Sequence, residues 1–465
     1  MEDIPTFQKP EDRFVLKRSG RSEKIDFRKI RERLEKLAVE QKCVNVNLNA
    51  IVELVERSVV TGIRTSQLDR NAANACSLMG LVHPDYTRLA GDIAVSNLHK
   101  ETPPSFLEAL RALDALKDIA GRDVGLIDKN LLNFVERHQD KIEKAIDHNF
   151  DYELFSHSAV NLLESKILLK DMEGKVRERP QHMWMRVALT LHKPDLERAL
   201  MAYRDMARGV YAPSLTALMS AGTKKAMMLD SYAFNMGDSL DLIYETIRHA
   251  GLTTSKGATT AVTVSDLRCA GSIIRKTNGT STGLVPMLRV MNEVAATFDM
   301  GGRKKAELTV YMEPWHNDVE KVLDLKKPGG TEELRARTQE YALMVPDIFM
   351  RRVRDGEQWS LFCPDEFQRL TSLSGEEFDA LYEKYEKEGR ARTTMPAKDL
   401  WRKITLGIAG HNSPKIIFKD NMNKTPGKAA ETIQTAGGKG EMAISVNENE
   451  PAAAAGGWVS LIKFC

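Results

Sequence analysis

The spacing of hydrophobic residues predicts a compact first module made of a hairpin and about four helices. "FVLKRSGRSEKIDF" (14–27) alternates apolar and polar residues around a Ser19-Gly20 turn, which predicts a short β-hairpin. "LNAIVELVERSVV" (48–60) repeats apolar residues every three or four positions, which predicts an amphipathic helix. Thr65 is expected to be the N-cap of the next helix, which would end near Gly80. The first module is therefore predicted to span residues 14–102.

The pattern changes twice further along the chain. Residues 103–222 read as a helical domain, with a small hairpin at Glu173-Gly174 followed by a long apolar helix. From 223 to 430, strand-like runs such as "ATTAVTVSDL" (258–267) and "AELTVYM" (306–312) alternate with helical runs. Such alternation predicts an α/β domain with a largely parallel sheet. Residues 431–465 are weakly patterned, so a degenerate or partly disordered segment is expected there.

Composition and charge exclude several classes of protein. The 465 residues carry a net charge of +2, which gives no sign of a nucleic-acid partner. No stretch of about 18 apolar residues predicts a membrane span, and the acidic start "MEDIPTFQKPEDRF" is not typical of a targeting peptide. A cytoplasmic location is therefore expected. The five cysteines form no CxxC pair, so neither a disulfide framework nor a metal site is predicted.

The stretch "TAGGKGEMA" (435–443) has the glycines and lysine of a phosphate-binding loop. A P-loop needs G-x-x-x-x-G-K-[ST] between a strand and a helix. Read back from Gly438-Lys439, the first glycine falls on Ile433 and the hydroxyl position falls on Gly440. The stretch is therefore interpreted as a loop that does not bind phosphate in this way.

Long stretches of the chain resemble one enzyme family. These stretches are "HPDYTRLAGDIAVSNLHKET" (83–102), "GKVRERPQHMWMRVALTLHK" (174–193), "TNGTSTGLVPMLRVMNEVAATFDMGG" (277–302), "YMEPWHNDVEKVLDLKK" (311–327) and "WSLFCPDE" (359–366). With them, the chain resembles the large subunit of class I ribonucleoside-diphosphate reductase, of the eukaryotic type, from about residue 14 to about residue 433.

The resemblance implies an ATP-cone at 14–102, a helical domain at 103–222 and half of a ten-stranded α/β barrel at 223–430. The family's large subunit is considerably longer than this chain. Half a barrel is expected to expose a sheet edge and an apolar face. We therefore expect a homo-oligomer, or a hetero-oligomer with a reductase large subunit, and the small subunit is a further possible partner.

The resemblance places an allosteric site for ATP or dATP in the first module. Lysine and arginine side chains suit a triphosphate, and carboxylates or a threonine hydroxyl suit the sugar and base. The residues that match the family's site are Lys17, Arg18, Glu23, Lys29, Thr65, Asp69 and Lys100.

A second family site binds the effector dNTP that sets substrate specificity. Asp238, Ser239, Leu240 and Arg268 match it, with the aspartate expected on the ribose and the arginine on phosphate. The chain departs from the family here, because the position of the family's lysine in the first loop falls on Ser255.

The resemblance also implies a radical reaction that this chain lacks the residues to perform. A cysteine in an N-x-C-x-E loop forms the thiyl radical, and two more cysteines reduce the ribose by forming a disulfide. Gly437 and Lys439 stand for the asparagine and the radical cysteine of this loop, and Glu441 is its only remnant. Ser231 stands for the first redox cysteine, and "EPAAAAGG" (450–457) holds no sulfur for the second.

We therefore expect a degenerate large-subunit homologue that keeps nucleotide binding. Its enzyme activity is left open, although the chain alone is expected to be inactive. Two alternatives remain: a scaffold subunit of a larger complex, and an active reductase subunit completed in trans. The C-terminal segment is either genuine or an artefact of gene prediction.

Overall fold

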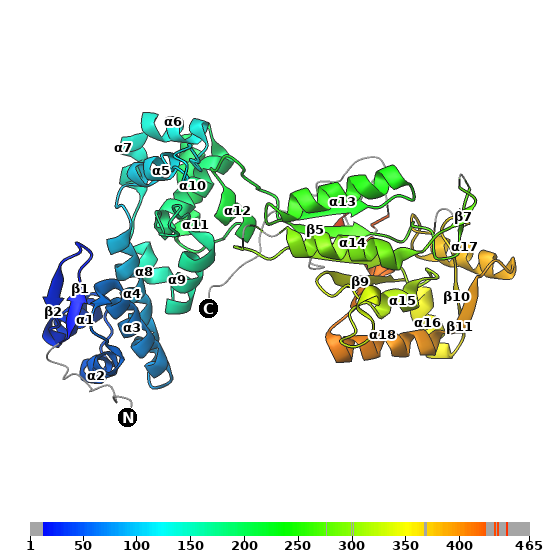
Figure 1. Cartoon of the computed structure of the whole chain (residues 1–465), viewed down its shortest axis with the longest axis horizontal. Coiled ribbons are helices and arrows are strands. Elements are labelled where there is room, and N and C mark those ends of the chain that lie inside the picture. Colours follow the sequence, from blue (N-terminus) through cyan, green and yellow to red (C-terminus); the bar gives the residue numbers. More distant parts are fainter. Residues whose placement is uncertain are drawn as a thin grey trace, which may run out of the picture. The chain divides into compact units, whose positions relative to one another are not determined.

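The computed structural model describes most of the chain as two compact units (Figure 1). It describes residues 13–275, 277–298, 300, 302–366, 370–424, 432–433, 435–436 and 443–444. The first unit ends at Ala226 and the second begins at Met227. None of the helices in these described ranges combines the length and apolarity needed to cross a membrane.

The first unit begins with a small three-stranded sheet packed among four helices. The sheet has the order β2-β1-β3, with β1 antiparallel to β2 and parallel to β3. Gly20 adopts a φ of 83° in the turn between β1 and β2, which a residue with a side chain rarely adopts. The strands are β1 (Phe14–Leu16), β2 (Ser22–Lys24) and β3 (Ile63–Arg64), and the helices are α1 (Phe27–Glu40), α2 (Leu48–Ser58), α3 (Thr65–Leu78) and α4 (Pro84–Glu101).

The hairpin and the amphipathic helix predicted in this module are present, but one helix cap differs. Ile51 and Val55 of α2 are fully buried, as the apolar stripe requires. Thr65 is the first residue of α3 and Arg64 is its N-cap, which makes no capping hydrogen bond. The prediction that Thr65 caps the helix is therefore wrong. Arg64 ends β3, so the strand runs directly into the helix and the cap position has an extended backbone.

The rest of the first unit is helical. The predicted hairpin lies at Lys170–Val176, with Gly174 in its turn, and the long apolar helix α10 follows it. The elements are α5 (Phe106–Asp114), α6 (Lys129–Arg137), α7 (Gln139–Ala145), α8 (Phe150–Leu154), α9 (His157–Leu162), the π-helical turn η3 (Leu163–Ile167), α10 (Pro180–His192), α11 (Leu196–Ala207) and α12 (Leu215–Ser220).

The second unit is built on an open, fully parallel five-stranded sheet of order β12-β9-β8-β5-β4. Its strands are β4 (Ser231–Asn235), β5 (Thr259–Thr263), β8 (Glu307–Met312), β9 (Glu340–Val345) and β12 (Lys415–Phe418). The shorter strands are β6 (Ile273–Ile274), β7 (Gly279–Thr280), β10 (Gln358–Leu361), β11 (Thr393–Pro396), β13 (Thr435–Ala436) and β14 (Ala443–Ile444). The predicted parallel α/β region is thus confirmed, and its described strands do not close into a barrel.

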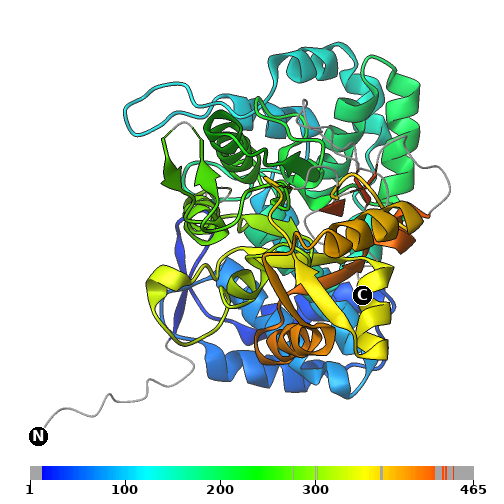
Figure 2. The ribbon, with the colours of Figure 1, turned by 90° about the vertical axis from the view of Figure 1, so that its right-hand side faces the viewer.

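Helices cover one face of this sheet (Figures 1 and 2). The strands alternate, so that Phe234, Val262, Val310 and Leu343 join the main core formed with the helices. Helix α13 packs against β5 and against α14. The helices of this unit are α13 (Leu240–Thr254), α14 (Leu284–Thr297), α15 (Val319–Leu323), α16 (Asp347–Asp355), α17 (Glu376–Lys387) and α18 (Ala397–His411), and the short α19 (Lys419–Asn423), whose Met422 packs on the opposite face.

The other face of the sheet corrects the expectation of an exposed apolar face. Ala233, Ala261, Tyr311, Ala342 and Met344 form a second, smaller core, and each is at most 1% exposed. Ile417 and Met422 pack against them. Three of the five side chains are only methyl groups, so this face carries little apolar area that needs to be covered.

Candidate functional site

Two carboxylates organise the candidate nucleotide site in the first module. Glu23 on β2 contacts Lys17 at 3.0 Å and Lys29 of α1 at 2.6 Å. Asp69 of α3 is nearly buried and lies 3.3 Å from Arg18 and 4.0 Å from Lys100 of α4. The seven predicted residues thus come from three helices and the β1–β2 hairpin. The fold gathers most of them into two groups, one around Glu23 and one around Asp69.

The group around Asp69 carries more positive charge than Asp69 can neutralise. Arg33 of α1 also pairs with Asp69, so three cations face this carboxylate, and a second carboxylate, Glu101, lies 3.9 Å from Arg18. The cluster therefore keeps an excess of one positive charge. Burial, together with Arg33 and Arg18, lowers the pKa of Lys100 to about 8. Burial and Arg18 likewise lower the pKa of Arg33 to about 10. A bound anion would relieve this repulsion.

Two cavities meet at these residues. A small one of about 170 Å³ is lined by apolar side chains such as Val15, Ile30 and Leu34, and by charged side chains of both signs, among them Lys29, Arg33, Glu23 and Asp69. A larger one of about 1260 Å³ is lined by eight lysine or arginine side chains and by two glutamates. Lys17 and Thr65 line both cavities. The smaller cavity suits a base and sugar, and the larger basic cavity suits phosphates.

The start of α3 adds a further feature that suits phosphate. Thr65 is the first residue of this 14-residue helix, and no side chain caps the helix at Arg64. Backbone N–H groups at a helix N-terminus, together with the helix dipole, favour bound anions. Thr65 therefore lies where its backbone N–H and its hydroxyl could both reach an anion.

Residues outside the predicted set also belong to the site. Arg33 pairs with Asp69, and Asn97 of α4 accepts a hydrogen bond from Arg18 at 2.5 Å. Arg33 lies four residues after Lys29 on α1, so helical spacing places both on one face and could have identified it. Asn97 lies three residues before Lys100 on α4, but nothing in its local sequence distinguishes it.

The residues predicted for the effector site also lie close together. Arg268 pairs with Asp238 at 2.7 Å and lies 3.7 Å from Asp365. Ser239 is the N-cap of α13 and accepts a hydrogen bond from the Leu242 N–H at 3.3 Å. Leu240 is exposed at the start of α13. Two carboxylates already face Arg268, and the pairing with Asp238 raises the pKa of Arg268. The excess of positive charge seen around Asp69 is therefore absent from this group of described residues.

Ser231 lies at the start of β4, on the sheet face opposite the helices. Its hydroxyl is buried and lies 2.8 Å from the Thr259 hydroxyl on the neighbouring strand. A hydroxyl cannot form a disulfide, so this position has no redox chemistry of its own. Gly437, Lys439 and Glu441 lie outside the described residues.

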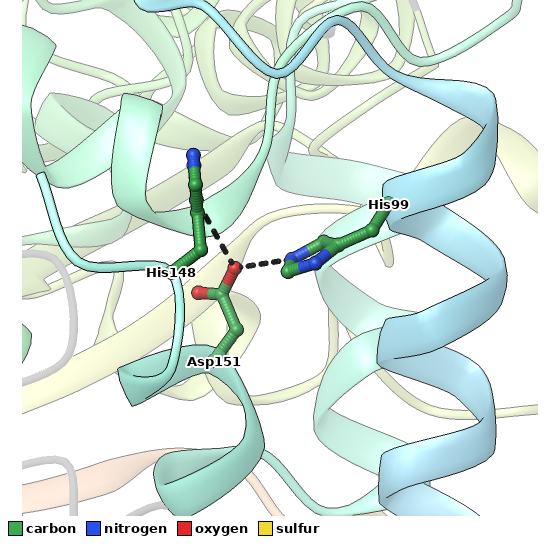
Figure 3. Close-up of side chains that lie close together, drawn as sticks. All are labelled: His99, His148 and Asp151. Atoms are coloured by element: carbon green, nitrogen blue, oxygen red, sulfur yellow. Dashed lines mark hydrogen bonds and ion pairs between the residues drawn. The ribbon is translucent and has the colours of Figure 1, made fainter. Parts of the chain in front are cut away.

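One group of side chains in the described ranges has the composition of a metal site. The ligand atoms of His99, His148 and Asp151 lie within 4.8 Å of one another. Figure 3 shows both rings beside the buried carboxylate, with His99 at 2.7 Å and His148 at 3.9 Å from it. Imidazole and carboxylate ligands suit zinc, but hydrogen bonds from His99 at 2.7 Å and Gln181 at 2.9 Å also satisfy the buried aspartate without a metal. The prediction that this chain holds no metal remains untested.

Comparisons with known proteins identify the class of protein. The family model of the ATP cone domain matches residues 13–101. The all-alpha domain of ribonucleotide reductase matches 153–226, and the barrel domain of the same enzyme matches 230–447. The two reductase models together span more than half of the chain. The fold and these matches therefore define a ribonucleotide reductase chain with an ATP cone in front.

Curated relatives narrow the assignment to one subunit. The chain is 38% identical over 412 residues to a Ribonucleoside-diphosphate reductase large subunit of Plasmodium falciparum (isolate Dd2). The matched region covers 88% of this chain and 51% of that protein. It is 39% identical over 416 residues to that of Arabidopsis thaliana, covering 88% of this chain and 50% of the relative. The chain belongs to the ribonucleoside-diphosphate reductase large-subunit family, and it spans about half the length of the curated relatives it matches.

Proposed function

We propose that this chain is a reductase large-subunit homologue that binds ATP or dATP in its cone and does not reduce ribonucleotides by itself. The observation that carries the proposal is the cluster around Asp69, where three cations outnumber the carboxylates of Asp69 and Glu101. A triphosphate supplies the negative charge that this cluster lacks. The adjoining cavities offer space for a base, a sugar and a phosphate chain.

The proposed loss of catalysis rests on the missing thiols. The family reaction converts a ribonucleoside diphosphate to the deoxyribonucleoside diphosphate and needs three cysteines. In this sequence Ser231 and Lys439 occupy two of those positions, and residues 450–457 contain no cysteine. Incubation of the purified chain with a ribonucleoside diphosphate and a dithiol reductant is expected to give no deoxy product. Product formation that Ser231→Ala abolishes would contradict this proposal.

Calorimetric titration of the full chain with ATP and with dATP tests the binding proposal. We expect saturable binding that weakens roughly tenfold to a hundredfold in Lys17→Ala, since a charged hydrogen bond contributes about 1.5–3 kcal/mol. Lys36→Ala is the matched control, because Lys36 is an exposed lysine on α1 that pairs only weakly with Glu40, at 3.8 Å. No binding by a folded chain would overturn the regulatory role.

The scaffold alternative and the partners are part of the same proposal. Leu240, Tyr244 and Leu252 are exposed on α13, and Val290 and Phe298 are exposed on and beside α14. Such apolar side chains on two adjacent helices support association with a second copy or with a reductase large subunit. The small-subunit partner, the cytoplasmic location, the segment boundaries at 102, 222 and 430, and completion of an active reductase in trans remain predictions.

A further inference from the structure

Two cysteines that have no role in the proposed function lie in contact within the second unit. Cys269 lies in the loop after β5, and Cys363 lies just after β10, so they are 94 positions apart in the chain. Both are fully buried. The Cys269 backbone N–H donates to the Cys363 Sγ at 3.4 Å, and the two thiols lie within hydrogen-bonding reach of each other. Neither stands at a position of the family's catalytic cysteines.

Hydrogen-bond donors converge on the Cys363 sulfur. The Ser272 hydroxyl lies 2.9 Å from it, and the backbone N–H of Asp365 also donates to it. Together with the Cys269 thiol, these donors hold the pKa of Cys363 at about 6. The pKa of Cys269 is raised, because its thiol donates to Cys363 and is buried. Arg392 donates to the Cys269 Sγ at 3.1 Å, so a cation faces the pair. The contacts thus favour a thiolate on Cys363 beside a thiol on Cys269.

The other two cysteines in the described ranges provide an internal comparison. Burial raises the pKa of Cys43 to about 11 and that of Cys76 to about 12. Both are buried, as Cys269 and Cys363 are. Among the described residues, they lack the hydrogen-bond donors that surround the Cys363 sulfur. If Cys363 reacts faster than Cys43 and Cys76, these donors and not burial explain the difference.

We propose that Cys269 and Cys363 form a reversible disulfide and are a redox modification site of this chain. The Cys363 thiolate attacks a peroxide oxygen, the O–O bond breaks, and a sulfenic acid and hydroxide form. The hydroxide takes a proton and becomes water. The Cys269 sulfur then attacks the Cys363 sulfur, the S–S bond forms, and the sulfenic oxygen leaves as the second water. Two thiols are oxidised and one peroxide is reduced, and a dithiol reductant restores both thiols.

The pair is placed to affect the proposed effector site. Arg268, which pairs with Asp238, directly precedes Cys269. Asp365, which faces Arg268 at 3.7 Å, is two residues after Cys363. A bond between the two sulfurs therefore constrains both segments that hold Arg268. This coupling rests on the proposed effector site, whereas the disulfide itself does not.

Peptide mass mapping of the full chain tests the pair, in a Cys465→Ser background that removes the fifth cysteine. After brief hydrogen peroxide treatment near neutral pH and alkylation, we expect a Cys269–Cys363 peptide that a dithiol reductant removes. Hydrogen bonds to the Cys363 sulfur favour its thiolate, whereas burial disfavours the thiolates of Cys43 and Cys76. Loss of the Cys363 thiol is therefore expected to be at least about tenfold faster than loss of Cys43 or Cys76.

Two variants separate the roles of the sulfurs. Cys269→Ser should leave a sulfenic acid on Cys363 that dimedone traps, and Cys363→Ser should leave Cys269 unreactive. Circular dichroism checks that each variant is folded. Two results in the wild-type chain would contradict the proposed disulfide. One is that Cys363 reacts no faster than Cys43, and the other is that Cys363 forms a sulfenic acid without the cross-link to Cys269.

Binding of dTTP to the reduced and the oxidised chain tests the coupling. We expect the affinity to differ at least about threefold between the two states. Equal affinities would show that the disulfide does not affect the effector site. The disulfide itself is tested separately by the mass mapping. No dTTP binding in either state would overturn the effector site on which the coupling rests.

Discussion

Asp69 shows how a single side chain sets the charge of the candidate nucleotide site. It is the shared partner of Arg18, Arg33 and Lys100, so it holds cations from the hairpin, α1 and α4 around one point. Burial, together with the neighbouring charges of Arg33 and Arg18, makes Lys100 easier to deprotonate than an ordinary lysine, with a pKa of about 8. The proton on Lys100 should therefore be linked to nucleotide binding.

Bound ATP is expected to raise the pKa of Lys100, because phosphate stabilises the charged amine. Above about pH 8 the free site holds mostly neutral Lys100, so ATP binding should take up a proton and the affinity should fall as pH rises. Calorimetry at about pH 8.5 in buffers of different ionisation enthalpy measures this uptake. Lys100→Arg is the control: it should bind ATP without the uptake, since arginine stays charged. Equal uptake by that variant would exclude Lys100 as the source.

For single residues, the sequence indicated which side chains could bind a nucleotide, but not which other side chains each of them contacts. Lys17, Glu23 and Lys29 could be named only through the resemblance. In the structure, Glu23 contacts Lys17 at 3.0 Å and Lys29 at 2.6 Å. Arg33 was missed although its spacing from Lys29 was visible. Contacts such as that between Cys269 and Cys363 join positions 94 apart, and no local pattern encodes them.

Helix α10 depends on a buried ion pair. Arg186 and Glu178 are at most 1% exposed, and two hydrogen bonds of 2.9 and 2.8 Å join them. Glu178 also accepts a hydrogen bond from the Leu169 N–H, and Arg186 donates to the Leu218 carbonyl. The pair thus connects α10 to the hairpin before it and to α12 after it.

Arg186→Met should lower the free energy of unfolding by about 3–5 kcal/mol, because it leaves a buried carboxylate without its partner. Urea denaturation of the full chain measures the change. Arg198→Met is the matched control on α11, because Arg198 is exposed and, among the described residues, pairs only with Asp195, at 3.3 Å. That variant should change stability by less than about 1 kcal/mol. Similar losses in the two variants would contradict this account of α10.

Helices and strands were largely predictable because their apolar spacing is local. The apolar stripe of α2 and the hairpin at 170–176 appear where the sequence indicates them. The exposed sheet face was predicted wrongly, because the expectation rested only on the resemblance to half of a barrel. Ala233, Ala261 and Ala342 instead make that face shallow, and how well it is covered depends on tertiary packing.

The whole molecule is expected to self-associate through the second unit. Tyr244 and Leu252 of α13 are 63% and 46% exposed, although both are large and apolar enough to favour burial. Light scattering should give a mass above the 52.2 kDa of one chain. Tyr244→Glu should weaken the association at least about tenfold, because burying the tyrosine contributes about 1.5–3 kcal/mol.

Val39→Glu serves as the control for that experiment. Val39 is an exposed apolar residue of α1 in the other unit, so the same change in charge there should leave the mass unchanged. A wild-type chain that stays at the mass of one chain at every accessible concentration would contradict self-association, and would favour a hetero-oligomer with a reductase large subunit.

Within the five-stranded sheet, each strand lies beside the sheet strand that comes before it in the chain. As the chain leaves the ribosome, β4 and β5 emerge first, and each later strand meets an edge that has already formed. The sheet can therefore grow in one direction during translation, without waiting for a distant segment to be inserted between finished strands. Until the next strand arrives, the growing edge offers unpaired backbone groups, so the interval between successive strands is when the nascent chain is most open to pairing with another copy.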